Sequence, residues 1–154
     1  QTWNPDSGIP FDESAKQEIF NELSKDYISG ITFSGGDPLY EYNLNEVLKL
    51  VKEIRISFPE KTIWLYTGFE WNEIMNYKIK ADLCEDNTSF EKHIKEDLSM
   101  IKRKNIISNV NVLVDGEYID EQKDLTLKFR GSKNQHVIDV KQSLAQNKIV
   151  LYCD

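Results

Sequence analysis

Hydrophobic residues recur along the chain with two periods, one typical of amphipathic helices and one typical of buried strands. The first helical pattern repeats every four residues from Ala15 to Tyr27 and follows Asp12, the expected N-cap. Three short apolar runs predict strands, at residues 31–33, 62–66 and 110–114. Each run ends in a turn that contains glycine, so the strands are predicted to be short and sharply ended.

Two further helical patterns lie between these strands. Residues 44–58 carry an apolar stripe behind Asn43-x-x-Glu46, a variant of the capping box. Thr88-x-x-Glu91 predicts the start of a later helix, whose apolar side would contain Phe90, Ile94, Leu98 and Ile101. Alternating helices and strands imply parallel strands joined by right-handed crossovers, and residues 137–140 and 149–152 add two late strand candidates.

Length and charge narrow the class of protein. A chain of 154 residues with 40% hydrophobic content fits one α/β domain over residues 1–154, because domains usually contain ~100 to 200 residues. The net charge of -7 argues against a nucleic-acid partner, which would need clustered cations. No apolar run approaches the ~18 residues of a membrane span, and the first residues do not form a secretory signal. These features predict a cytoplasmic protein without a membrane partner.

The turn after the first strand, Ser34-Gly35-Gly36-Asp37-Pro38, is the strongest candidate for a binding site. Two adjacent glycines let backbone N–H and C=O groups approach a ligand and permit positive φ. The Asp37 carboxylate can accept a hydrogen bond from an ammonium group, and Pro38 stiffens the exit from the turn. A tight turn without a ligand is the alternative, and the loop has neither of the usual nucleotide-phosphate motifs.

The turns after the other two strands carry further candidates. Asp115 directly follows an apolar strand, where a carboxylate can bind a cation, a ribose hydroxyl or an amide, or can cap its own turn. Thr67 stands at the equivalent place after the strand at 62–66. The block Arg-Gly-Ser-x-Asn-Gln at 130–135 can hold a carboxylate or a partner's backbone, or can form a solvated loop. Cys84 and Cys153 lie far apart and predict no metal site of their own.

Together these blocks resemble the activating proteins of anaerobic ribonucleotide reductase, a family within the radical-SAM superfamily. The resemblance spans nearly the whole chain and is weakest at residues 77–106 and after His136. The five blocks that carry it lie at residues 2–4, 31–39, 63–69, 111–118 and 129–135.

The resemblance implies a partial (β/α) barrel with mainly parallel strands, a [4Fe-4S] cluster and S-adenosylmethionine. In such enzymes the reduced cluster passes an electron to the sulfonium, and the resulting radical takes a hydrogen atom from a glycine of the large reductase subunit. The implied cofactor-binding residues are Ser34, Gly35, Gly36 and Asp37 at the methionine amino end, with Asp115 and Thr67 lining the same pocket.

The family's Cys-x3-Cys-x2-Cys motif is not present in this sequence, so the cluster ligands and the first strand are expected to precede Gln1. The chain as printed is therefore expected to be inactive by itself. The resemblance further implies a variable helical insertion at 77–106, a C-terminal extension at 136–154 and a flavodoxin-type electron donor. Two alternatives are an activase of another glycyl-radical enzyme and a non-catalytic domain that binds S-adenosylmethionine without a cluster.

Overall fold

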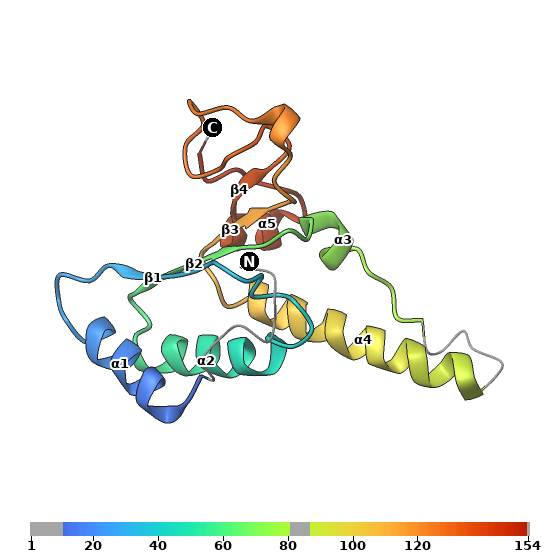
Figure 1. Ribbon diagram of the computed structural model, residues 1–154, viewed down its shortest axis with the longest axis horizontal. Coiled ribbons are helices and arrows are strands. Elements are labelled where there is room, and N and C mark those ends of the chain that lie inside the picture. Colours follow the sequence, from blue (N-terminus) through green and yellow to red (C-terminus); the bar gives the residue numbers. More distant parts are fainter. Residues whose placement is uncertain (1–10, 81–86, 154) are drawn as a thin grey trace.

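The computed structural model describes residues 11–80 and 87–153, with side chains from Phe90 onward in the second part, and these residues form an α/β structure (Figure 1). The strands predicted at 31–33, 62–66, 110–114 and 137–140 and the main predicted helices are present. The strands are β1 (Gly30–Phe33), β2 (Thr62–Tyr66), β3 (Val112–Asp115) and β4 (His136–Asp139). The helices are α1 (Glu13–Leu23), α2 (Leu44–Ser57), α3 (Trp71–Met75), α4 (Asn87–Ile107) and α5 (Val140–Gln146), with a 3-10 helix η3 (Asp120–Gln122).

The four strands make one sheet in the order β1-β2-β3-β4. Strands β1, β2 and β3 are parallel, as predicted, whereas β4 runs antiparallel to β3 and pairs His136 with Asp115. The strand predicted at 137–140 stops one residue earlier because Asp139 accepts a hydrogen bond from the Gln142 N–H and so caps α5. The strand predicted at 149–152 is wrong, since that segment forms an isolated antiparallel bridge between Leu151 and Ile138, with two flanking backbone hydrogen bonds to β4, and not a strand.

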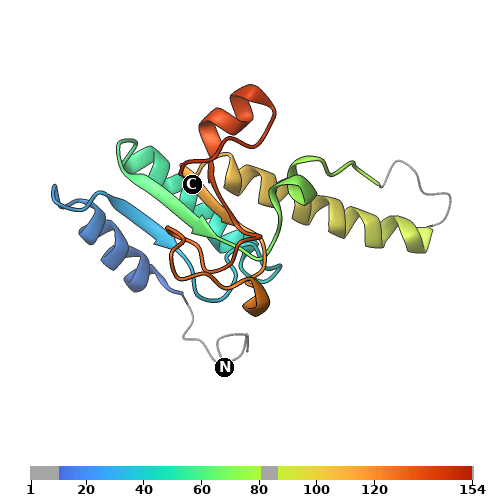
Figure 2. The same cartoon turned by 90° about the horizontal axis from the view of Figure 1, so that it is seen from above.

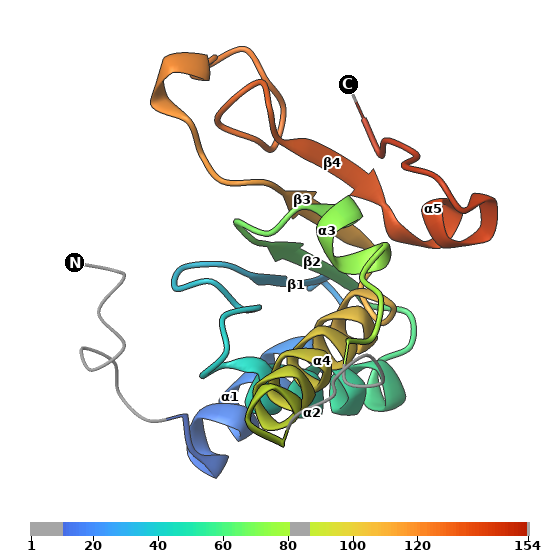
Figure 3. The same cartoon turned by 90° about the vertical axis from the view of Figure 1, so that its right-hand side faces the viewer.

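Helices α1, α2 and α4 lie together on one face of the sheet, which Figures 2 and 3 show from above and from the side. Their apolar faces pack on alternate strand residues such as Ile63, Leu65 and Leu113, all fully buried. The opposite face of the sheet carries a smaller cluster formed by Val112, Val114 and Val137 with Trp64, Tyr66 and Cys153 packed beside it. The helix-covered face therefore holds the main core.

The two predicted helix starts within the first half of the chain have different outcomes. Asp12 caps α1 as predicted, because its Oδ1 accepts a hydrogen bond from the Ala15 N–H at 2.8 Å. The capping box at the start of α2 is wrong. Asn43 has helical backbone angles, and its amide instead donates to the Asp37 carbonyl at 2.9 Å. Asn43 therefore ties the start of α2 to the glycine turn.

The apolar face predicted for α4 is also wrong. Phe90, Leu98 and Ile101 are each more than 40% exposed, while Asp97 and Met100 are buried. The first half of α4, which contains Phe90, projects beyond the sheet, as Figure 2 shows, and Leu98 and Ile101 lie in the second half on a side of the helix other than that of the buried Met100. Neither α4 nor any other helix in the described part of the chain is long and apolar enough to cross a membrane.

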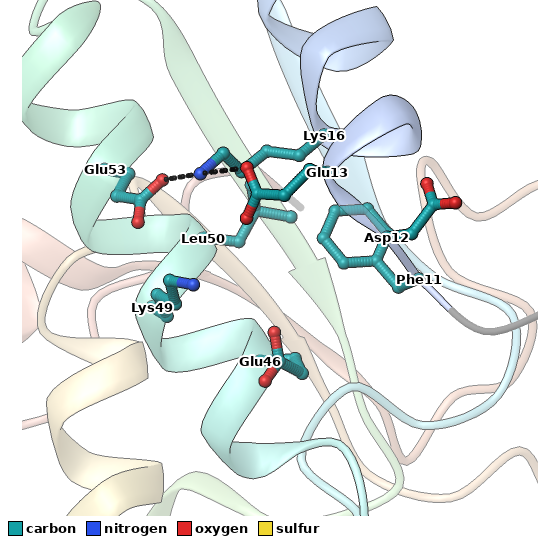
Figure 4. A pocket seen from close by; sticks show the side chains of 8 residues that line it. All are labelled: Phe11, Asp12, Glu13, Lys16, Glu46, Lys49, Leu50 and Glu53. Atoms are coloured by element: carbon teal, nitrogen blue, oxygen red, sulfur yellow. Dashed lines mark ion pairs between the residues drawn. The ribbon is translucent and has the colours of Figure 1, made fainter.

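A shallow cavity of about 210 Å³ lies between α1 and α2, away from the strand ends (Figure 4). The Lys16 ammonium pairs with Glu13 of its own helix at 3.1 Å and with Glu53 of α2 at 3.0 Å. The hydrogen bonds that Lys16 donates to these two carboxylates raise its pKa, and the bond to Glu53 has the larger influence. These ion pairs connect α1 to α2 and occupy three of the charged residues that line the cavity.

Candidate functional site

A second cavity, of about 260 Å³, lies at the carboxyl ends of β1, β2 and β3. Ligands of parallel α/β sheets usually bind at this edge, because loops and helix N-termini converge there. The volume is close to the lower end of the ~300 to 1,000 Å³ range of ligand pockets. Its lining comes from the three strand ends and the start of β4, and consists of Gly35, Asp37, Tyr66, Thr67, Gly68, Gly116, Glu117, Tyr118 and Gln135.

The glycine turn after β1 contributes Gly35 to this cavity. Its φ of +97° is unfavourable for residues with a side chain, and a Cβ atom at this position would have no neighbour within 4 Å. Gly35 therefore exposes its backbone to open space inside the predicted site. Ser34 and Gly36 are exposed in the same turn but do not line the cavity.

Asp37 connects the glycine turn to the end of β2. Its carboxylate accepts hydrogen bonds from the Leu39 N–H at 2.8 Å and the Gly68 N–H at 2.8 Å. The buried Thr67 hydroxyl donates to the same carboxylate, at 2.9 and 3.0 Å from its two oxygens. A carboxylate offers about four lone-pair sites, so three donors leave room for one more. Asp37 and Thr67 thus both line the cavity and are hydrogen-bonded to each other.

Asp115 lies in a different environment from the one predicted. It is only 2% exposed and is not among the residues that line the cavity. Its carboxylate accepts hydrogen bonds from the Trp71 N–H at 2.8 Å and the His136 N–H at 3.0 Å, and its Oδ1 lies 2.9 Å from His136 Nδ1. Asp115 therefore joins the ends of β3 and β4 to the first turn of α3.

Tyr66 is a lining residue that the sequence patterns did not single out as a binding residue. Burial raises the pKa of its phenol, and the neighbouring Cys153 raises it further, so the hydroxyl stays protonated at neutral pH and can donate a hydrogen bond. The alternation along β2 places Tyr66 and Trp64 on the face away from the helices. This alternation is the sequence feature that could have identified Tyr66 as a residue on the open face of the sheet.

Arg103 of α4 contacts residues next to the site, and the sequence patterns did not single it out either. Its Nε donates to the Leu39 carbonyl at 3.0 Å, and its guanidinium lies 4.2 Å from the centre of the Phe69 ring. Desolvation by burial lowers the pKa of Arg103, while the nearby acidic residues Glu73, Asp37 and Glu41 oppose that shift. No local pattern connects a residue of α4 with the glycine turn, so this contact arises only in the folded chain.

Comparison with known proteins adds information on ancestry. A family model described as a 4Fe-4S single cluster domain matches residues 1–138. The anaerobic ribonucleoside-triphosphate reductase-activating protein of Escherichia coli K12 is 34% identical over 138 residues, which cover 88% of this chain and 73% of that protein. Its counterpart from Enterobacteria phage T4 is also 34% identical, covering 88% of this chain and 69% of the relative.

This chain belongs to the family of anaerobic ribonucleoside-triphosphate reductase-activating proteins. The relative from Haemophilus influenzae, 30% identical over 137 residues, carries the same name. The resemblance inferred from the five blocks is thereby confirmed. No solved structure gives a significant match to this activating-protein chain.

The family match supports an iron–sulfur cluster as a cofactor. In the described residues 11–80 and 87–153, no group of three or more His, Cys, Asp or Glu side chains could hold a metal ion. Cys153 is a free thiol, and Cys84 lies outside the described residues. The described part of this activating protein therefore contains no set of side chains that could bind the cluster. Its cavity at the strand ends is the candidate site for a small ligand.

Proposed function

We propose that this chain binds S-adenosylmethionine in the cavity at the carboxyl ends of β1 to β3 and activates anaerobic ribonucleoside-triphosphate reductase. The observation that carries the proposal is the backbone cradle at Gly35. This residue combines a positive φ with unfilled space beside its Cα, and it borders a carboxylate that has capacity for one more donor. Such a cradle suits the amino acid end of the ligand.

In this proposal the turn from Ser34 to Asp37 holds the methionine amino end, and Thr67 holds the Asp37 carboxylate in place. The ammonium group would donate to the remaining lone-pair site of Asp37, which gives a charge-assisted hydrogen bond. Asp115 does not line the pocket and acts on it indirectly. It fixes the end of β3 through Trp71 and His136 rather than through a lining position.

When bound, S-adenosylmethionine and the cluster supply the radical chemistry of activation, and the protein supplies position and shielding. The residues described here orient the ligand and help to exclude water. Tyr66 contributes a protonated phenol to the lining, and the Arg103 guanidinium holds the exit of the glycine turn at Leu39.

The proposal includes the wider features that the family resemblance implied. The parallel strands β1 to β3 with helices on one face are consistent with part of a radical-SAM (β/α) barrel. We further propose that the partner is the large subunit of the reductase, that a flavodoxin-type protein donates the electron, and that activation takes place in the cytoplasm. The names of the relatives favour this partner over another glycyl-radical enzyme.

The decisive experiment uses the full-length protein with its cluster reconstituted anaerobically. Mixing it with reductant, S-adenosylmethionine and the reductase large subunit should produce a glycyl radical signal in electron paramagnetic resonance, together with cleavage of the ligand. A formate-lyase-type glycyl enzyme serves as the control partner and should give no signal. Cleavage with neither partner activated, or no cleavage at all, would reject the proposed activity.

A further inference from the structure

The Arg-Gly-Ser-x-Asn-Gln block at 130–135 has no role in the site as proposed so far, yet its last residue lines the cavity. The Gln135 carboxamide is engaged at both ends. Its Nε2 donates to the Gly116 carbonyl at 2.8 Å, and its Oε1 accepts hydrogen bonds from the Gly131 N–H at 3.0 Å and the Ser132 N–H at 3.2 Å. One planar group thus joins the block to the residue that follows β3.

The segment that Gln135 holds is the β3 side of the cavity, formed by residues 116–118. Gly116 has a φ of +88°, and its N–H donates to the Phe69 carbonyl at 3.1 Å. The neighbouring Asn134 repeats the arrangement, since its Nδ2 donates to the Glu117 carbonyl at 2.8 Å. The carbonyls of Gly116 and Glu117, two consecutive residues on the β3 side of the cavity, are therefore each held by one of two consecutive amide side chains.

The direction of these carbonyls also sets the direction of the N–H groups in the wall. In a planar trans peptide the C=O and the following N–H point in opposite directions. Holding the Gly116 carbonyl toward Gln135 therefore orients the Glu117 N–H, and holding the Glu117 carbonyl orients the Tyr118 N–H. Both of these residues line the cavity.

Building on the proposed function, we propose that Gln135 is a positioning residue of the S-adenosylmethionine site. It fixes the backbone of Gly116 to Tyr118 in the orientation that receives the part of the ligand beyond its amino acid end. A carboxamide is required because it donates and accepts at once. A glutamate keeps the acceptor for residues 131 and 132 but loses the donor to Gly116.

The test is calorimetric titration of S-adenosylmethionine into the full-length, anaerobically reconstituted protein and its Gln135→Glu variant. The variant should bind about tenfold more weakly with unchanged stoichiometry, because it repels the Gly116 carbonyl while keeping the other contacts. The matched control is Gln142→Glu, which changes an exposed glutamine of α5 that binds only Asp139 among the described residues. The control should bind like the wild type.

Asn134→Ala provides a second, independent variant, with an expected loss of about threefold from the single hydrogen bond to Glu117. If Gln135→Glu does not fold, the affinity of Asn134→Ala for S-adenosylmethionine is the test of the inference. Unchanged affinity in the folded variants overturns the inference. A lower stoichiometry with unchanged affinity also overturns it, because Gln135 would then support folding without shaping the site. Absence of binding by the wild type would instead reject the proposed function on which the inference rests.

Discussion

The two ends of the parallel strands satisfy their polar groups with side chains of opposite charge. At the amino ends, the Arg55 guanidinium donates to the carbonyls of Asn109 and Lys61, and the buried Lys61 ammonium donates to two carbonyls that follow α1. At the carboxyl ends, the Asp37 and Asp115 carboxylates accept hydrogen bonds from backbone N–H groups. Cations hold one edge of the sheet and anions hold the other.

The difference follows from the direction of the helices. In a βαβ crossover each helix ends near the amino edge of the sheet, where its partial negative charge attracts cations and the loop that follows presents carbonyls such as those of Asn109 and Ile28. Loops at the carboxyl edge present free N–H groups and lead into helix starts, which favour anions. Among the described residues, the carboxyl edge alone combines this with a glycine at positive φ beside a cavity, at Gly35 and again at Gly116. The comparison therefore predicts stability effects at both edges and ligand effects at one.

Asp115→Ala should have the largest effect on stability, since it removes the shared acceptor of the Trp71 and His136 N–H groups. Leaving these buried or half-buried donors unpaired should lower the free energy of unfolding by about 3 kcal/mol, measured by urea denaturation. Asp120→Ala is the control, because that exposed carboxylate bonds to the Tyr118 hydroxyl, and it should change stability by less than about 0.5 kcal/mol. Equal stability of both variants would show that Asp115 is not a cross-link.

Arg55→Met should lower the free energy of unfolding by about 2 kcal/mol, because the carbonyls of Asn109 and Lys61 lose a charged donor. Affinity for S-adenosylmethionine should not change, as the residue lies at the amino edge. Lys52→Met changes an exposed cation of the same helix and controls for loss of charge. The contrast between the edges breaks down if Arg55→Met weakens ligand binding in protein that remains folded.

Asp37→Ala should weaken affinity for S-adenosylmethionine by about 1.5 kcal/mol, roughly tenfold, through loss of the proposed bond to the ammonium group. Titration calorimetry measures the effect. Asp12→Ala is the matched control, since it removes an equivalent carboxylate that caps α1 and should reduce stability by about 1 kcal/mol without touching the ligand. Unchanged affinity in the Asp37 variant would place the ligand elsewhere.

The smallest expected effect concerns the pH dependence of the loop between β3 and β4. Hydrogen bonds from the Thr126 hydroxyl and N–H lower the pKa of Asp124. Its contribution to stability is therefore present above the ordinary aspartate pKa and is lost as the pH falls through the lower pKa of the folded state. Thr126→Val should move the Asp124 pKa back toward its ordinary value in an NMR titration. An unmoved pKa would mean that the hydroxyl is not its cause.

The chain order of strands and helices was predictable because hydrophobic spacing depends on neighbours within a few residues. Asp12 could be identified as an N-cap for the same reason, since the Ala15 N–H that donates to it lies three residues away. The proximity of Thr67 to Asp37 was also predictable, because parallel strands bring their carboxyl ends to the same edge of the sheet. The exposed stripe on α4 was not predictable, because periodicity shows that a face is apolar but not whether anything covers it.

By itself the sequence determined the α/β class, the glycine turn and the family, all of which are written in short contiguous patterns. Tertiary structure alone decided that Asp115 bonds to Trp71 and His136 instead of lining the cavity, and that Gln135 reaches back to Gly116. These partners are 19 to 44 residues apart. Which of several possible donors a buried carboxylate or amide meets depends on how distant segments pack, and no local pattern contains that information.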